Sequence, residues 1–96
     1  MNSNKIKKIE NLSLMQSLKV LYLRNNKIEN LSNLSNLKHL EDLDISFNRI
    51  EQIEVKKIVP KLEILNISSN QLINLEGFEN FPNLKNLNLK DNDFDS

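Results

Sequence analysis

The sequence predicts an α/β solenoid, in which coils of the chain stack and their strands form a short four-stranded parallel sheet. Two observations predict this fold class. Four segments share the pattern L-x-x-L-x-L-x-x-N-x-[I/L/F] and start at Leu18, Leu40, Leu62 and Leu84, so successive starts lie 22 residues apart. Between these segments, apolar residues recur at every third position. The 96 residues should form one domain of about four repeats, with a partial repeat over residues 6–17.

The strand of each repeat is expected where apolar residues alternate with a period of two. In the first repeat, Leu21 and Leu23 alternate with Val20, Tyr22 and Arg24. The four strands should therefore lie near residues 20–24, 42–46, 64–68 and 86–90. Because each repeat returns the chain to the same place, the strands should stack in parallel and turn alternate side chains away from the core.

The segments that connect one strand to the next should contain 3₁₀ turns or loops. Ile28, Leu31, Leu34 and Leu37 recur in strict threes, whereas an α-helix alternates spacings of three and four. The single glycine, Gly77, lies in such a segment, where the turn favours a positive φ.

The second connecting segment departs from this pattern, because Lys56 occupies an apolar position. A local shift of the backbone should turn Val55, Ile58 and Val59 inward and Lys56 outward.

An asparagine holds the same place in every repeat, and these residues are Asn26, Asn48, Asn70 and Asn92. The chain turns sharply there, and buried backbone N–H and C=O groups need hydrogen-bond partners. A side-chain amide supplies donors and an acceptor, so these residues should form a structural ladder that links the turn of one repeat to the next. The alternative is a polar site lined by four asparagines, which is less favoured because the side chains should point inward.

The repeat resembles the 22-residue class of leucine-rich repeats. Stretches such as INLEGFENFPNLKNLNLKDN and LSNLKHLEDLDISFNRI are close to the consensus of that class. The class includes a nuclear regulatory subunit of protein phosphatase 1 and the leucine-rich light chain of axonemal dynein, and bacterial internalins use a similar period. The resemblance implies a leucine-rich-repeat horseshoe with the sheet on its concave face, and a non-catalytic protein that binds other proteins.

The strand side chains that point away from the core should line this concave face, where we expect a partner to bind. They form three rows: Val20, Asp42, Ile64 and Asn86; Tyr22, Asp44, Asn66 and Asn88; Arg24, Ser46, Ser68 and Lys90. The expected contact cluster is Tyr22, Arg24, Asp42, Asp44 and Ile64, because Tyr and Arg are enriched in interface hot spots. The alternative is that these are ordinary solvated strand residues. Phe47, outside the rows, should pack rather than bind.

Composition and motifs give no argument for catalysis, a cofactor, nucleic acid or a membrane. Thirteen basic and 13 acidic residues cancel, and no cysteine can supply a disulfide or a thiolate metal ligand. His39 is the single histidine, and it holds a position of the repeat where the other repeats have polar residues, so it should lie on the surface. Asp42 and Asp44 have no second histidine near them to complete a catalytic group. The aspartates near the C-terminus lack the glycine and glutamate of a calcium loop. We therefore expect no enzyme and no metal site.

The expected function is a cytoplasmic adaptor or regulatory subunit that binds an unidentified protein. The segment MNSNKIKKIENLSL lacks the apolar run of a secretory signal peptide. A second interpretation is a structural protein whose copies stack head to tail through uncapped ends. Residues 1–24 carry five basic and one acidic residue, a net of +4, and residues 76–96 carry two basic and five acidic residues, a net of −3. A third is a piece of a longer array.

Overall fold

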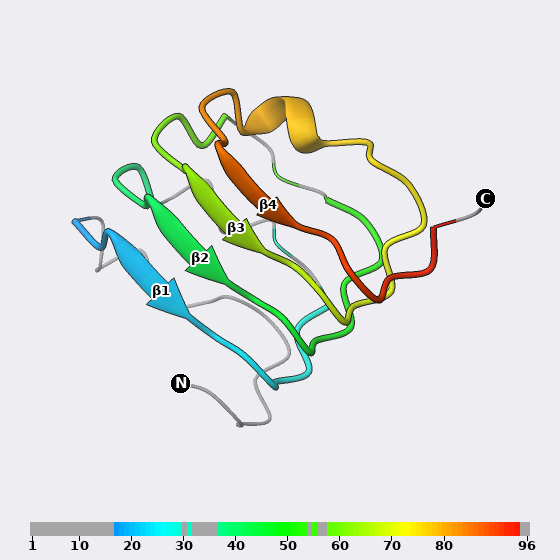
Figure 1. The fold of residues 1–96 in the computed structure, drawn as a ribbon. Coiled ribbons are helices and arrows are strands. Elements are labelled where there is room, and N and C mark those ends of the chain that lie inside the picture. The colour runs from blue at the N-terminus through cyan, green and yellow to red at the C-terminus, as the bar shows by residue number, and fades with distance from the viewer. Residues whose placement is uncertain (1–16, 30, 32–36, 54, 56–57, 95–96) are drawn as a thin grey trace.

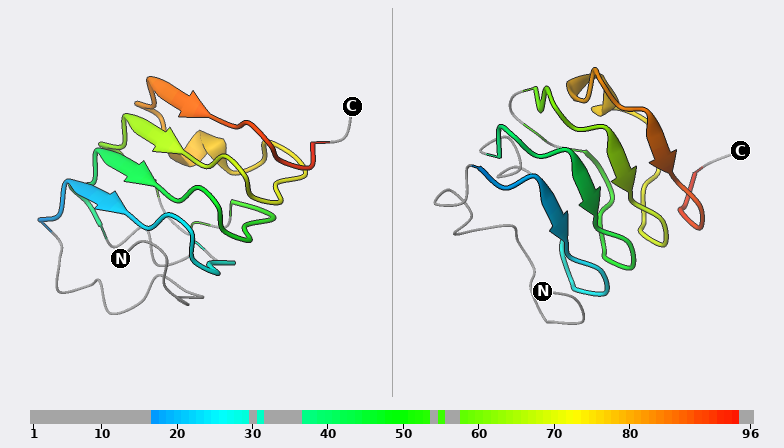
Figure 2. Two further views of the ribbon diagram at one scale, coloured as in Figure 1. Left: turned by 60° about the horizontal axis from the view of Figure 1, so that its bottom comes forward. Right: turned by 60° about the vertical axis from the view of Figure 1, so that its left-hand side comes forward.

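The computed structural model of the chain describes residues 17–29, 31, 37–53, 55 and 58–94. Four strands form one parallel sheet in chain order: β1 (Val20–Tyr22), β2 (Asp42–Asp44), β3 (Ile64–Asn66) and β4 (Asn86–Asn88). Figure 1 shows the four strands side by side and pointing the same way, and Figure 2 shows the connecting segments returning on the other side of the coil. The predicted solenoid is confirmed. The predicted partial repeat, residues 6–17, lies outside the described residues except for Ser17.

The register of the sheet repeats the period of the sequence. Leu21 pairs with Leu43, Leu43 with Leu65, and Leu65 with Leu87, so each step across the sheet is one repeat along the chain. These four leucines therefore line up along one axis on the inner side of the sheet. The first three are buried, but Leu87 is 41% exposed. The difference arises because no described residue packs on the outer side of β4.

Each strand begins where the sequence predicts but is three residues long instead of five. In β2, the Asp44 carboxylate accepts hydrogen bonds from both the N–H and the hydroxyl of Ser46, at 3.0 and 2.6 Å. In β3, the Asn66 amide oxygen accepts the same two bonds from Ser68. The N–H that would continue the strand ladder is thus used by the side chain two residues earlier, and the strand ends.

The repeated asparagines make the hydrogen bonds that link adjacent coils. The Asn70 Nδ2 atom donates to the carbonyl oxygens of Ile67 and Ser68 in its own turn and of Ile45 in the preceding coil, at 3.0–3.1 Å. Its Oδ1 atom accepts from the N–H of Ile50, also in the preceding coil, at 3.0 Å. Asn48 and Asn92 repeat the pattern one coil earlier and later.

Each ladder asparagine bonds to the preceding coil rather than to the following one. The way in which the strands end explains this direction. Because the Ser68 N–H donates to Asn66, the Ile45 carbonyl receives no bond from it and accepts from Asn70 instead. No buried side-chain nitrogen or oxygen among the described residues lacks a hydrogen-bond partner. The Asn70 side chain itself satisfies the Ile45 and Ile67 carbonyl groups and the Ile50 N–H, backbone groups that the sharp turn would otherwise leave unpaired.

The residue before each ladder asparagine adopts a left-handed backbone conformation. The φ angles are 60° at Asn25, 57° at Phe47, 54° at Ser69 and 58° at Asp91. Asparagine and aspartate tolerate this conformation well, whereas it is uncommon for a bulky residue such as phenylalanine. The same reversal at the same place in every repeat turns the chain out of the sheet and presents the next side chain to the ladder.

The connecting segments contain one 3₁₀ turn within the described residues, η3 (Phe78–Asn80). Gly77 precedes it with a φ of 94°, as the sequence predicts. In the second connecting segment Val59 is buried and Val55 is partly buried, but Ile58 is 57% exposed, so its predicted inward position is wrong. Val59 occupies the same place as Leu37 and Phe81, which are also buried, and this leaves its neighbour Ile58 on the outside. Lys56 lies outside the described residues.

Asn70→Ala should lower the free energy of unfolding by ~1–3 kcal/mol, because buried backbone groups lose their partners. Urea denaturation of wild type and variant measures the difference. Asn86→Ala is the matched control, since this exposed asparagine makes no side-chain hydrogen bond in the described part of the chain. The control should change stability by less than about 0.5 kcal/mol. Equal losses in the two variants would contradict a structural role of the ladder.

Gly77→Ala should lower the free energy of unfolding by at least ~1–2 kcal/mol, because an L-residue is disfavoured at positive φ. The added Cβ would also lie 2.7 Å from the Ile53 Cβ atom and against the Ile53 carbonyl oxygen. Thermal and urea melts measure the effect. Glu76→Ala, at an exposed neighbouring position, should leave the melt nearly unchanged. A Gly77→Ala protein as stable as wild type would refute the need for glycine.

Candidate protein-interaction face

Three apolar side chains on the concave face are substantially exposed. Val20 is 49%, Tyr22 is 48% and Ile64 is 42% exposed. Asp42 lies between Val20 and Ile64, because the strand register pairs it with both. The first row therefore places a carboxylate between two branched apolar side chains, with the tyrosine ring beside it. Tyrosine is among the residues most enriched in the hot spots of protein interfaces, so Tyr22 is the strongest candidate contact of the three.

The tyrosine and the carboxylate are joined. The Tyr22 hydroxyl donates a hydrogen bond to Asp42 Oδ2 at 3.1 Å. This bond and the negative charge of Asp42 raise the pKa of the Tyr22 hydroxyl above its usual value of 10.0, with a smaller contribution from Asp44. The bond fixes the orientation of the ring on the surface. A partner would thus meet a tyrosine that already has one preferred position, which reduces the entropy lost on binding.

Arg24 contacts residues of the second coil near the C-terminal end of β2. Its Nε atom donates to Ser46 Oγ at 3.2 Å and lies 3.6 Å from Asp44 Oδ2. Its guanidinium carbon lies 5.9 Å from the centre of the Phe47 ring, a cation–π distance. Phe47 is 49% exposed, so it packs under Arg24 rather than in the core. The expectation that it packs rather than binds a partner stays a prediction.

The structure corrects the position of one predicted row. Ser46 is fully buried and Ser68 is 9% exposed, so their side chains are not available on the concave face. Both hydroxyls are turned toward the side chain two residues earlier, which holds them under the surface. Arg24 and Lys90, in the same row, are exposed because no such hydroxyl is present. The pattern Asp-x-Ser or Asn-x-Ser is the sequence signal that predicts this turn.

Three residues of the second row, Asp44, Asn66 and Asn88, also stabilise the turns that follow their strands. Oxygens of Asp44, Asn66 and Asn88 accept the N–H two residues later, at 3.0–3.1 Å. These side chains are half-buried, whereas Asn86 in the first row is exposed. Of the predicted contact cluster, the geometry brings Tyr22 and Asp42 together, and Arg24 and Asp44 together. Ile64 lies beside Asp42 on the next strand.

The remaining predicted sites take the following positions. His39 is exposed, as expected, and its Nδ1 atom lies 3.3 Å from Lys61 Nζ. The ladder residues Asn26, Asn48 and Asn70 are buried, with Asn92 half-buried, so they do not line an accessible site. The described residues hold no cluster of three or more potential metal ligands. Residues 1–16, which supply most of the predicted basic end, lie outside the described residues, so the head-to-tail contact stays a prediction.

No helix in the described part of the chain is long and apolar enough to cross a membrane.

Comparisons with known proteins agree with this architecture. A family model described as leucine rich repeat matches residues 38–94, and a model described as leucine rich repeats (2 copies) matches residues 16–57. No curated protein matches the sequence. Among solved structures, the chain is similar to an internalin (inlF) from Listeria monocytogenes str. 4b F2365, with 23% identity and a TM-score of 0.59. The similarity covers 92% of this chain and 32% of that chain, and at this identity it shows the fold alone.

Tyr22 is the single tyrosine of the chain, so its ionisation can be followed by ultraviolet absorbance. Wild type should titrate above 10.0, and Asp42→Asn should bring the pKa back toward 10.0. Because the folded-state pKa is raised, the contribution of this bond to stability is present below pH 10 and is lost as pH rises through the raised value. Asp91→Asn, in the turn that follows β4, is the control and should leave the titration unchanged. A wild-type value at or below 10.0 would contradict the hydrogen bond.

Proposed function

The chain belongs to the leucine-rich repeat family, and from this premise we propose that it is a non-catalytic module that binds a protein on its concave face. Stacked repeats present an extended surface whose curvature follows from the small rotation between coils, and such proteins use this surface for binding. Val20, Tyr22, Asp42 and Ile64 form the centre of the proposed contact.

One observation carries this proposal: three exposed apolar side chains surround an accessible carboxylate on a sheet that cannot change its register. Exposed Val20, Tyr22 and Ile64 come from two different coils, and the parallel pairing holds them in place. A rigid surface loses little conformational entropy when a partner binds. Asp42, whose only described partner is the neutral Tyr22 hydroxyl, adds a negative charge that can select a partner with a basic group opposite it.

The finer parts of the proposal rest on the sequence. An adaptor or regulatory role follows from the resemblance to the 22-residue class of leucine-rich repeats, and membership of that class is supported by the 22-residue register of the strands. The cytoplasmic location stays a prediction. The absence of enzymatic activity is likewise part of the proposal, supported by a family whose members commonly mediate protein–protein interactions. The competing class is a structural protein that stacks head to tail.

Ile64→Asp should abolish capture of a specific partner from an extract of the source cell, with the chain immobilised as bait. The substitution replaces an exposed apolar contact by a second charge beside Asp42, and a central interface residue of this kind typically contributes more than ~1 kcal/mol. Tyr22→Ala should weaken capture as well.

The matched control is Ile58→Asp. This isoleucine is also exposed, 57% against 42% for Ile64, but it lies in a connecting segment outside the sheet. It should bind the partner as wild type does. Loss of the partner in both variants, or in neither, would overturn the concave-face proposal. Circular dichroism of the variants verifies that each remains folded.

A further inference from the structure

One carboxylate on the concave face has no cation beside it among the described residues. The Asp42 side chain is half-buried, and its one described hydrogen bond comes from the neutral Tyr22 hydroxyl, which donates to Oδ2 at 3.1 Å. Asp44, on the same strand, differs because the Arg24 Nε atom lies 3.6 Å from its Oδ2 atom. The ion pairs of the described residues do not include Asp42, so its negative charge is available to a partner.

Apolar side chains stand on both sides of this carboxylate. The strand register pairs Asp42 with Val20 of β1 and with Ile64 of β3, and neighbouring strands of a sheet lie about 4.8 Å apart. Both apolar side chains are substantially exposed, 49% for Val20 and 42% for Ile64. A partner that covers them also removes water from the carboxylate, which is costly unless the partner supplies a cation. The occupant of this place must therefore carry a positive charge on an apolar support.

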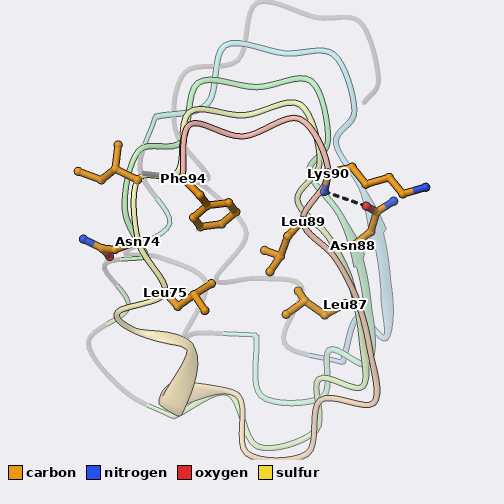
Figure 3. A pocket seen from close by; sticks show the side chains of 8 residues that line it. Asn74, Leu75, Leu87, Asn88, Leu89, Lys90 and Phe94 are labelled. Carbon is orange, nitrogen blue, oxygen red and sulfur yellow. Dashed lines mark hydrogen bonds between the residues drawn. The ribbon is translucent and has the colours of Figure 1, made fainter. Parts of the chain in front are cut away.

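The fourth strand presents the opposite chemistry on the same face. Figure 3 shows that Asn88 and Lys90 point away from the coil, whereas Leu87 and Leu89 point into it. Lys90 is exposed, and its N–H donates to Asn88 Oδ1 at 3.1 Å. The concave face thus has a carboxylate between apolar side chains on β1 to β3, and amides and a cation at β4. A cationic group of a partner is repelled by Lys90 and attracted by Asp42, which orients the partner along the stack.

We propose that the concave face binds a partner segment in which a lysine stands between apolar residues, with the lysine ammonium on Asp42, a contact that rests on the proposed function and names the chemistry of the partner. The ammonium donates to Asp42 Oδ1, the oxygen that the Tyr22 hydroxyl leaves unbonded. It also donates to the Tyr22 hydroxyl oxygen, which keeps lone pairs after donating its own hydrogen. The methylene groups of the lysine contact Val20 and Ile64, and the flanking apolar residues cover the exposed tyrosine ring.

Lysine fits this place better than arginine does. A guanidinium group pairs best with a carboxylate when its planar fork bonds both oxygens at once. Here Asp42 Oδ2 already accepts the Tyr22 hydroxyl, so the fork would have to share that oxygen. An ammonium group is a compact charge whose donors rotate, so Oδ1 and the tyrosine oxygen are sufficient for it. The long apolar stem of lysine also suits the apolar side chains that flank the carboxylate.

Selection from a phage-displayed library of short random peptides tests the proposal. Peptides that bind the immobilised wild-type chain are retained only when they fail to bind Tyr22→Ala, so the retained peptides depend on the concave face. Their sequences should share a lysine with apolar residues on both sides. The strongest binder that contains neither tyrosine nor tryptophan is then synthesised. Its binding is followed by the fluorescence of Tyr22, because the chain has one tyrosine and no tryptophan.

Variants of the chain and of the peptide test the contact between the lysine and Asp42. Asp42→Asn, which keeps the shape of the side chain, should raise the dissociation constant of this peptide by at least about tenfold. Asp91→Asn removes the same charge in the turn that follows β4 and is the matched control, which should bind as wild type does. Methionine in place of the peptide lysine should weaken binding to wild type but add little to the loss in Asp42→Asn, because both changes remove one contact. Asp42→Lys should bind the peptide that carries glutamate in place of the lysine.

The lysine contact and the concave-face function fail on different outcomes. Retained peptides that share no lysine, that have arginine in its place, or that bind Asp42→Asn as tightly as wild type would overturn the lysine contact and leave the concave face as the binding surface. A library that yields no peptide dependent on Tyr22 would overturn both. Circular dichroism and urea denaturation of each variant exclude misfolding as the cause of lost binding.

Discussion

The stack depends on the amide side chain that each coil extends to the one before it. Asn70 contacts three carbonyl oxygens and one N–H, two of these four groups in its own turn and two in the preceding coil. Such a set of bonds can be made only when the two coils have equal length and the same phase. A coil longer or shorter by one residue would place the amide against the wrong groups and leave several buried backbone groups unpaired, at ~1–3 kcal/mol each. The ladder therefore holds the strands in a 22-residue register.

That register decides which side chains share the concave face, but a second set of bonds decides which of them are accessible. The oxygen of Asp44 or Asn66 ends its strand by accepting the N–H and hydroxyl of the serine two residues later. This buries Ser46 and Ser68, and it uses the side-chain oxygens of Asp44 and Asn66 in the second row. The side chains of the first row make no such bonds to the turn. The exposed surface that remains, Val20, Tyr22, Asp42 and Ile64, is thus the part of the sheet that the turn does not use for its own stability.

The coils are alike in sequence but unequal in surroundings. Leu43 and Leu65 have a coil on each side and are buried, whereas Leu87 holds the same place in β4 and is 41% exposed. In a solenoid each repeat contacts only its neighbours, so what the interior coils satisfy internally, the last described coil presents outward.

The sequence by itself determined the period, the parallel order of the strands, the residues at which they begin, the inward leucines and the positive φ at Gly77. These features repeat, and a local pattern of apolar spacing and turn residues specifies each of them. Only the tertiary structure decided where the strands end, that Ser46 is buried and Ile58 exposed, and that the Tyr22 hydroxyl joins Asp42. These outcomes depend on competition between hydrogen-bonding and packing groups that lie one coil apart. A single repeat carries no information about which of its groups the neighbouring coil will satisfy.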